Sequence, residues 1–232
     1  RLWLINNDRW ITLDTDPILV AERYSMLVFY MGMGGPFWEQ QYQFLNPDTH
    51  ICEWGGTAVD PVDGQPVLTC TSADRVKSMS IIHNDLAGAI PSEMAAMEML
   101  EVLRLERNQL GGTLPSELGL LHGLKTLNVA YNYLNENIPT EIGNLTSLQI
   151  LKLRCNPFLE GSVPTQLNQL LELKEVTLDR TRITDVEVLC EVQRPLFVLA
   201  ANCRAEPPLA CSCCFGCIRP GLECERELVD GS

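Results

Sequence analysis

The sequence predicts an α/β repeat fold: a short right-handed solenoid with a parallel concave sheet, a helical N-terminal cap and a disulfide-rich C-terminal cap. Three observations predict it. An apolar pattern recurs about every 24 residues between residues 76 and 186. Apolar side chains at helical spacing precede these repeats. Seven of the ten cysteines lie between Cys190 and Cys224, after the last repeat.

These patterns divide the chain into five segments. We expect an extended N-terminal segment over residues 1–15, an N-terminal cap over 16–75, four full repeats and a partial fifth over 76–186, a Cys-rich C-terminal cap over 187–218 and an acidic tail over 219–232.

The N-terminal segment has no helical period, yet Trp3 and Trp10 are too apolar for a solvated tail. It lies either along the flank of its own domain or against a neighbouring molecule. Asp16 and Pro17 then form a typical helix start, because an acidic cap precedes proline in the first turn. We expect this helix to end near Gly32 and to cover the first coil of the solenoid.

Each repeat follows the pattern L-x-L-x-x-N-x-L-x-G-x-I-P, which is typical of leucine-rich repeats. The leucines of the short L-x-L strand point inward, and the alternate residues point to the concave face. One asparagine in each repeat is expected to join a ladder that satisfies buried backbone groups where the chain turns. The ladder positions are Asn84, Asn108, Asn132 and Asn156, and Thr181 fills the last position less completely. Glu136 replaces the glycine of the third repeat.

Cys52, Trp54 and a second cysteine, Cys70, precede the first repeat. Together with the L-x-G-x-I-P repeats, they resemble plant-type extracellular leucine-rich-repeat proteins. The phrases Leu-Ala-Ala-Asn-Cys over 199–203 and Cys-Ser-Cys-Cys over 211–214 are similar to secreted or single-pass leucine-rich-repeat proteins of diatoms and related stramenopiles. This resemblance covers about residues 16 to 218. It implies a second short strand in each coil, a mild superhelical twist and a disulfide between Cys52 and Cys70.

The density of cysteines predicts disulfides formed in an oxidising compartment. A zinc cluster is the weaker interpretation, because the adjacent Cys213 and Cys214 fit tetrahedral spacing poorly, so no metal site is predicted. Cys155 either reaches the C-terminal cap or stays a free thiol, and we favour the free thiol with Cys224 left over. The cysteines expected in disulfides, without assigned connectivity beyond the first pair, are Cys52, Cys70, Cys190, Cys203, Cys211, Cys213, Cys214 and Cys217.

Location and excluded partners follow from the same residues. Asn144-Leu145-Thr146 is an N-glycosylation sequon, which has meaning only in a secreted chain. Together with the disulfides, it predicts an extracellular or cell-surface protein. A net charge of −13 disfavours nucleic acid and anionic membranes as partners. The longest apolar run, residues 24–33, is too short to span a bilayer, so a membrane would be reached only through a segment absent from this chain.

No sequence motif predicts catalysis. A nucleophile elbow, a phosphate loop and metal-ligand spacing are all missing, and the three histidines are scattered along the chain. We therefore predict a protein that is not an enzyme and that uses no cofactor.

The concave face is the candidate binding site. Five cations fall on it with few carboxylates, although charge pairing between neighbouring strands is an alternative reason for their presence. The candidate residues are Arg104, Glu106, Arg107, Asn128, Tyr131, Lys152, Arg154, Asp179 and Arg180. If the face binds a ligand, we expect an acidic protein segment or an acidic polysaccharide. Five strands give a strip roughly 20 Å long and about 15 Å wide, or about 300 Å² of face. This area is smaller than the roughly 800 Å² per partner of a stable protein complex.

The sequence thus predicts an extracellular, non-enzymatic interaction domain. One alternative is a structural subunit of a cell-surface or secreted fibre, which would assemble through Trp3, Trp10 and the spare Cys224. A second alternative is the ectodomain of a membrane receptor. An inhibitor of wall-degrading glycosidases, as some plant-type relatives are, is a further one.

Overall fold

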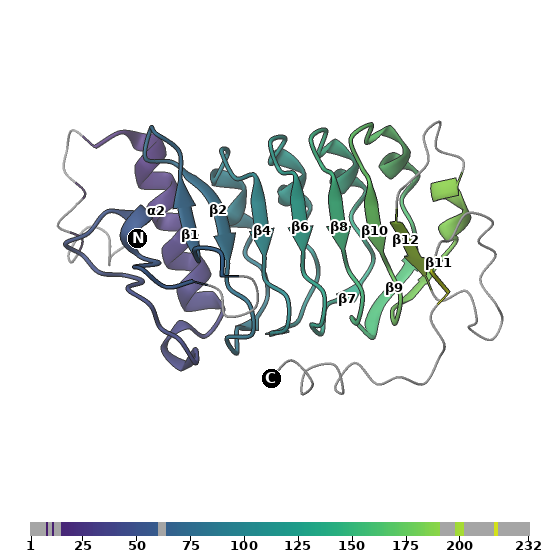
Figure 1. Cartoon of the computed structure of the whole chain (residues 1–232), viewed down its shortest axis with the longest axis horizontal. Coiled ribbons are helices and arrows are strands. Elements are labelled where there is room, and N and C mark those ends of the chain that lie inside the picture. Colours follow the sequence, from purple (N-terminus) through teal and green to yellow (C-terminus); the bar gives the residue numbers. More distant parts are fainter. Residues whose placement is uncertain are drawn as a thin grey trace.

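In the computed structural model the chain forms an elongated solenoid whose coils lie side by side, with α2 at one end (Figure 1). The structure describes residues 8, 11, 15–59, 64–190 and 198–201, and the backbone of 216–217. A single large sheet of eight strands runs along the molecule. Its strands, in spatial order, are β1 (Leu68–Cys70), β2 (Val76–Ser80), β4 (Val102–Arg104), β6 (Thr126–Asn128), β8 (Ile150–Lys152), β10 (Glu175–Thr177), β12 (Val198–Ala201) and β13 (Gly216–Cys217).

The strand register follows from the repeat. From β2 to β13 all neighbouring strands are parallel, and β1 alone runs antiparallel to its neighbour β2. Equivalent repeat positions lie directly opposite one another, so that Arg104 pairs with Asn128 and Asn128 with Lys152. The predicted parallel concave sheet is therefore confirmed.

The opposite, convex side is built from 3-10 helices. Four of them begin directly after a proline with extended backbone angles, at positions 91, 115, 139 and 164. Proline suits this place because its fixed φ sets the chain up for the following turn. The convex helices are η3 (Ser92–Ala96), η4 (Ser116–Leu120), η5 (Thr140–Asn144), η6 (Thr165–Gln169) and η7 (Val186–Cys190).

A second short strand in each coil, which the plant-type resemblance implied, is also present. These strands form two further parallel sheets, β3 with β5, and β7, β9 and β11 together. Their bounds are β3 (Ala87–Gly88), β5 (Gln109–Leu110), β7 (Asn135–Glu136), β9 (Phe158–Ser162) and β11 (Arg182–Thr184).

The asparagine ladder satisfies backbone groups between coils. The amide nitrogen of Asn132 donates to the carbonyls of Leu105, Val129 and Ala130 at 3.0–3.2 Å, and its Oδ1 accepts from the backbone N–H of Leu110. Asn108 and Asn156 make equivalent bonds to their own coil and to the preceding one. Asn108, Asn132 and Asn156 thus each link two adjacent coils, as predicted. The side chain of Asn84 instead bonds the backbone of Gln40 in the N-terminal cap. The hydroxyl of Thr181 bonds to Leu178 and Ile183 of its own coil.

The N-terminal cap consists of α2 (Pro17–Gly32), η1 (Gly35–Phe37) and η2 (Ile51–Glu53). The side chain of Asp16 caps the predicted helix by accepting from the backbone N–H of Ile18 at 2.8 Å. The cap is closed by the predicted disulfide between Cys52 and Cys70.

Buried charges hold the cap helix in place, a feature that the sequence did not predict. Arg23 is 1% exposed and forms an ion pair with Asp8, whose side chain is also buried. The guanidinium lies 4.6 Å from the ring centre of Trp54 and donates to the Thr49 carbonyl at 2.8 Å. Asp8 therefore packs against its own domain, while Trp3 and Trp10 lie outside the described residues.

The repeat pattern ends at Val186, but the main sheet continues beyond it. Strand β12 pairs with β10, and β13 pairs with β12. Cys155 and Cys190 are both disulfide-bonded. The preference for a free thiol at Cys155 is therefore wrong. The predicted cap cysteines Cys203, Cys211, Cys213, Cys214 and Cys217, and the spare Cys224, have no described side chains.

Within the described ranges, no helix has both the length and the apolar character that crossing a membrane requires.

Candidate functional site

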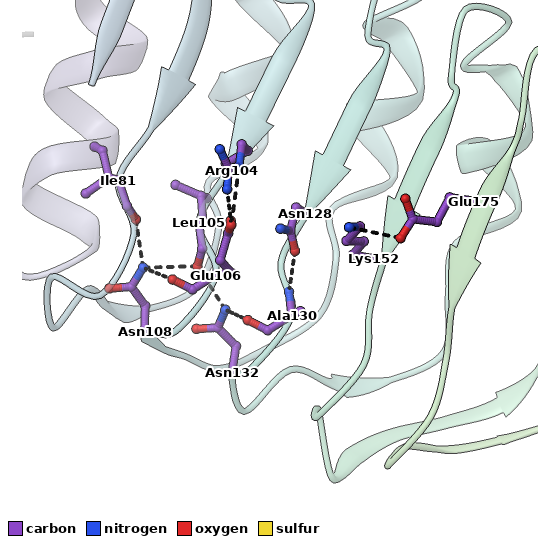
Figure 2. A network of polar contacts seen from close by, with 10 residues as sticks. All are labelled: Ile81, Arg104, Leu105, Glu106, Asn108, Asn128, Ala130, Asn132, Lys152 and Glu175. Carbon is purple, nitrogen blue, oxygen red and sulfur yellow. Dashed lines mark hydrogen bonds and ion pairs between the residues drawn. The ribbon is translucent and has the colours of Figure 1, made fainter. Parts of the chain in front are cut away.

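The concave face is formed by side chains that project from the main sheet and from the first residues after each strand. One row crosses the sheet through Ser80, Arg104, Asn128, Lys152 and Thr177. The next residues along each coil add Glu106, Arg154 and Asp179. Figure 2 shows Arg104, Glu106, Asn128 and Lys152 of this face above the asparagine ladder.

At least three of the five predicted cations form ion pairs on this face. Arg104 contacts Glu106 at 2.7 Å, and Lys152 contacts Glu175 of the next strand at 2.9 Å. Arg154 contacts Asp179, whose side chain is fully buried, at 3.2 Å. Charge pairing therefore explains part of the basic character, and Arg154 in particular neutralises a carboxylate that has no access to water.

An aromatic ring separates two of the arginines. The guanidinium groups of Arg107 and Arg154 lie 5.2 Å and 5.4 Å from the ring centre of Tyr131. Both distances are within the range of cation–π attraction. Arg180 reaches back toward the preceding coil, where its Nη1 lies 3.6 Å from Sγ of Cys155. The structure thus brings Arg107, Tyr131, Arg154 and Arg180 together at one edge of the face.

The balance of charge on the face remains positive. Among the described residues of the face, five cations stand against the carboxylates of Glu106, Glu175 and Asp179, which leaves about +2 in a chain of net charge −13. Exposure is uneven: the side chain of Lys152 is 33% exposed and that of Arg154 is 26% exposed. Glu106, Asn128 and Asp179 are buried. They therefore hold neighbouring side chains in place more than they contact a ligand themselves.

Sequence reasoning missed a further row of charge at the start of the strands. Lys77 and Lys125 flank Glu101 at 3.9 Å and 2.8 Å, and Lys174 lies 3.1 Å from Gln149. The pKa of Glu101 is lowered, mainly because Lys125 hydrogen bonds to its carboxylate. These residues lie about one repeat apart, so comparing this repeat position in each coil would have found them.

Two buried hydroxyls also belong to this face. Ser80 and Thr177 are 3% and 7% exposed, and their hydroxyl oxygens make no hydrogen bond within the described part of the chain. They lie in the same row as Arg104, Asn128 and Lys152, one on each side of these three residues. No sequence signal marks a serine or threonine as unsatisfied, because that depends on its neighbours.

Neither metal binding nor catalysis gains support from the described residues. His50, Cys52 and Asp74 approach one another closely, but the sulfur of Cys52 is committed to its disulfide with Cys70. His50 is buried, which lowers its pKa and disfavours its charged form. His83 is exposed, and Nδ1 of His122 lies 3.1 Å from the backbone carbonyl of Asn144.

Comparison with known sequences gives a partial match. The Leucine Rich Repeat family model matches residues 99–121 and 123–145, which are two of the coils. The fold is that of a leucine-rich-repeat protein. No curated protein matches the sequence.

Solved leucine-rich-repeat structures share this fold at low sequence identity. The BIR3–SERK2 complex from Arabidopsis thaliana is 25% identical, and the match covers 73% of this chain and 84% of that chain with a TM-score of 0.59. The leucine-rich-repeat ectodomain of the receptor kinase SOBIR1 from the same plant is 20% identical and covers 78% and 90%, with a TM-score of 0.56.

The structure of PEPR1–AtPEP1 is 22% identical over 79% of this chain, with a TM-score of 0.59. This chain spans only 24% of the length of that one. The structural neighbours therefore include plant leucine-rich-repeat ectodomains, and the fold they share is typical of protein-interaction domains.

Proposed function

We propose that this chain is an extracellular, non-enzymatic interaction domain that binds an acidic partner along its concave face. The observation that carries the proposal is the positive balance of that face in a strongly acidic chain. Complementary charge increases the rate of encounter and disfavours wrongly charged partners.

The extracellular location is supported by cysteine chemistry. Cys52, Cys70, Cys155 and Cys190 are all disulfide-bonded, and such bonds persist in oxidising compartments. The resemblance of residues 199–203 and 211–214 to diatom and stramenopile proteins supports a secreted or surface-attached protein of such an alga. The receptor-ectodomain alternative is favoured by one observation, the fold shared with the SOBIR1 ectodomain.

The first choice of partner is an acidic segment of another protein. The similar BIR3–SERK2 structure is a complex of two proteins, which supports this class of partner. An acidic polysaccharide is the rival ligand, and the experiment below separates the two. The fibre-subunit alternative depends on Trp3, Trp10 and Cys224, which all lie outside the described residues.

The test removes two cations of the face without placing a new charge beside a carboxylate. In the double variant Arg104→Gln and Lys152→Gln, we expect retention on an immobilised polyglutamate peptide to fall about tenfold for each lost charged contact. Arg154 is left intact, because removing it would leave the fully buried Asp179 uncompensated, whereas the amide that replaces Arg104 can still donate to Glu106, whose side chain is 10% exposed. Binding is measured at low salt by surface plasmon resonance, alongside an immobilised polyuronate.

The matched control removes two cations elsewhere: Lys174→Gln at the start of a strand and Arg182→Gln, whose side chain is 62% exposed on β11. This control should keep its affinity although its net charge changes equally. Equal losses in both double variants would show that net charge alone causes retention. Retention on polyuronate but not on polyglutamate would assign the face to a glycan. Unfolding curves measured on the same variants show whether a loss of binding is caused by a loss of folding.

A further inference from the structure

The convex side of the solenoid carries two strongly exposed leucines. Leu120, the last residue of η4, is 59% exposed, and Leu171, just after η6, is 72% exposed. Exposed apolar surface of this kind is open to association with other molecules unless something covers it. Between the coils that carry them lies η5, which ends on Asn144 of the sequon.

The sequon takes the repeat positions of both leucines. Asn144 ends η5 as Leu120 ends η4, and Thr146 holds in its coil the position that Leu171 holds in the following coil. Only in this middle coil do the two positions carry the asparagine and threonine of a sequon.

These convex helices pack closely against one another. A Cβ added to Gly119 would lie 2.4 Å from the backbone carbonyl oxygen of Glu141, and one added to Gly143 would lie 2.3 Å from Cβ of Gln166. Nδ1 of His122 also lies 3.1 Å from the carbonyl oxygen of Asn144. Because the helices are in direct contact, a group attached at Asn144 stands between Leu120 and Leu171.

Both sequon side chains are accessible. Asn144 and Thr146 are exposed, and the side-chain amide of Asn144 makes no hydrogen bond to any residue that the structure describes. Nothing among those residues would therefore have to move to admit a sugar.

We propose that Asn144 carries an N-linked glycan that covers Leu120 and Leu171 and keeps the convex side from associating. In the transfer, Nδ2 of Asn144 loses one proton and bonds to the anomeric carbon of the first sugar. The bond from that carbon to a polyisoprenyl pyrophosphate donor breaks, and the lipid pyrophosphate leaves. A glycan is bulky and solubilising, so it suits a position between two exposed apolar side chains.

This proposal rests on the extracellular location proposed above and not on concave-face binding. The closing experiment uses the full chain secreted from eukaryotic cells, with glycan occupancy measured by intact mass before and after enzymatic removal of N-linked sugars. Association is followed by light scattering, and exposed apolar surface by fluorescence of a hydrophobic dye.

We expect wild-type protein to be occupied and monomeric. The variants Asn144→Gln and Thr146→Ala should both lose the glycan, bind several-fold more dye and associate as concentration rises. Thr146→Ser keeps a sequon and should behave as wild type. Adding Leu120→Ser and Leu171→Ser to Asn144→Gln should restore the monomer, because the apolar surface is then removed together with its cover.

An unmodified Asn144 in secreted protein would overturn the proposal. So would a glycan-free variant that stays monomeric with unchanged dye fluorescence, or association that persists after the two leucines are replaced. Retention on polyglutamate is measured in the same samples and should be equal in wild type and Asn144→Gln. Failure of the glycan proposal is thereby distinguished from failure of the concave-face proposal.

Discussion

At the scale of single residues, Glu136 occupies a repeat position that is glycine in other coils, and this substitution costs folding free energy. It has φ +60° at the position where Gly88, Gly112 and Gly161 have φ +106°, +71° and +86°. A side chain is disfavoured in this left-handed region by about 1 kcal/mol. Replacing Glu136 by glycine should therefore raise the free energy of unfolding by up to about 1 kcal/mol, as measured by urea denaturation.

The neighbouring Asn135 provides the control for this substitution. It lies on the same short strand, and its φ is not positive. Asn135→Gly should lower the free energy of unfolding by about 0.5–1 kcal/mol, because glycine gains only unfolded-state entropy there. Stabilisation by both changes, or by neither, would contradict the assignment of strain to position 136.

Two glutamates should respond to pH in opposite directions. Burial raises the pKa of Glu22, although its bonds to Arg75 and to the backbone of Val76 oppose the shift. Its contribution to stability is therefore full below about pH 4.5 and is lost as pH rises through the raised value. The hydrogen bond from Lys125 lowers the pKa of Glu101. The contribution of Glu101 to stability is therefore present above about pH 4.5 and is lost as pH falls through the lowered pKa.

The variants Glu22→Gln and Glu101→Gln test these signs by urea unfolding between pH 3 and pH 8. Rising pH should improve the stability of Glu22→Gln relative to wild type and worsen that of Glu101→Gln. The second effect should be a few tenths of a kcal/mol, because the Glu101 side chain is about a third exposed and solvent screens its ion pair. Parallel pH profiles for the two variants would contradict the assignment.

At the scale of elements, α2 is held by charge as well as by its apolar face. Arg23 lies between Asp8 and Trp54 with almost no solvent exposure. Arg23→Met should lower the free energy of unfolding by about 3–5 kcal/mol, because it leaves the carboxylate of Asp8 buried without its cation. The measurement is chemical denaturation at neutral pH.

The double variant Asp8→Leu and Arg23→Met decides whether the pair acts through this mechanism. Removing both charges should recover part of the loss, since an apolar pair of similar volume avoids the buried charge. Recovery should be incomplete, because Arg23 also donates to the carbonyls of Thr49 and Asn46. A double variant less stable than Arg23→Met would contradict this account.

At the scale of the whole molecule, the described sheet is longer than the repeats alone predict. Eight strands share the sheet, against five in the repeat pattern, so the face extends over about 34 Å. With a width of about 15 Å, it offers roughly 500 Å², still below the roughly 800 Å² per partner of a standard protein interface. We therefore expect an extended segment of a partner, or a weak complex, to be the ligand of this face.

The sequence by itself determined the solenoid, the strand register and the ladder. A repeated pattern fixes these features because each coil buries its leucines and bonds its asparagine only against an identical neighbour. The rows that hold Arg104, Lys152, Arg154 and Asp179 could be read from that period for the same reason.

Only the tertiary structure decided which charges neutralise one another. Arg154 could reach carboxylates on either side, and the full burial of Asp179 makes that ion pair the one that matters. The burial of Arg23 against Asp8 was likewise beyond the sequence, because the ion pair joins segments that no period relates. The sequence left two alternatives for Cys155, and the structure shows that it is disulfide-bonded. The repeat period determines the path of the backbone. Which side chains pair with one another depends on their burial and on contacts made by the ends of the chain.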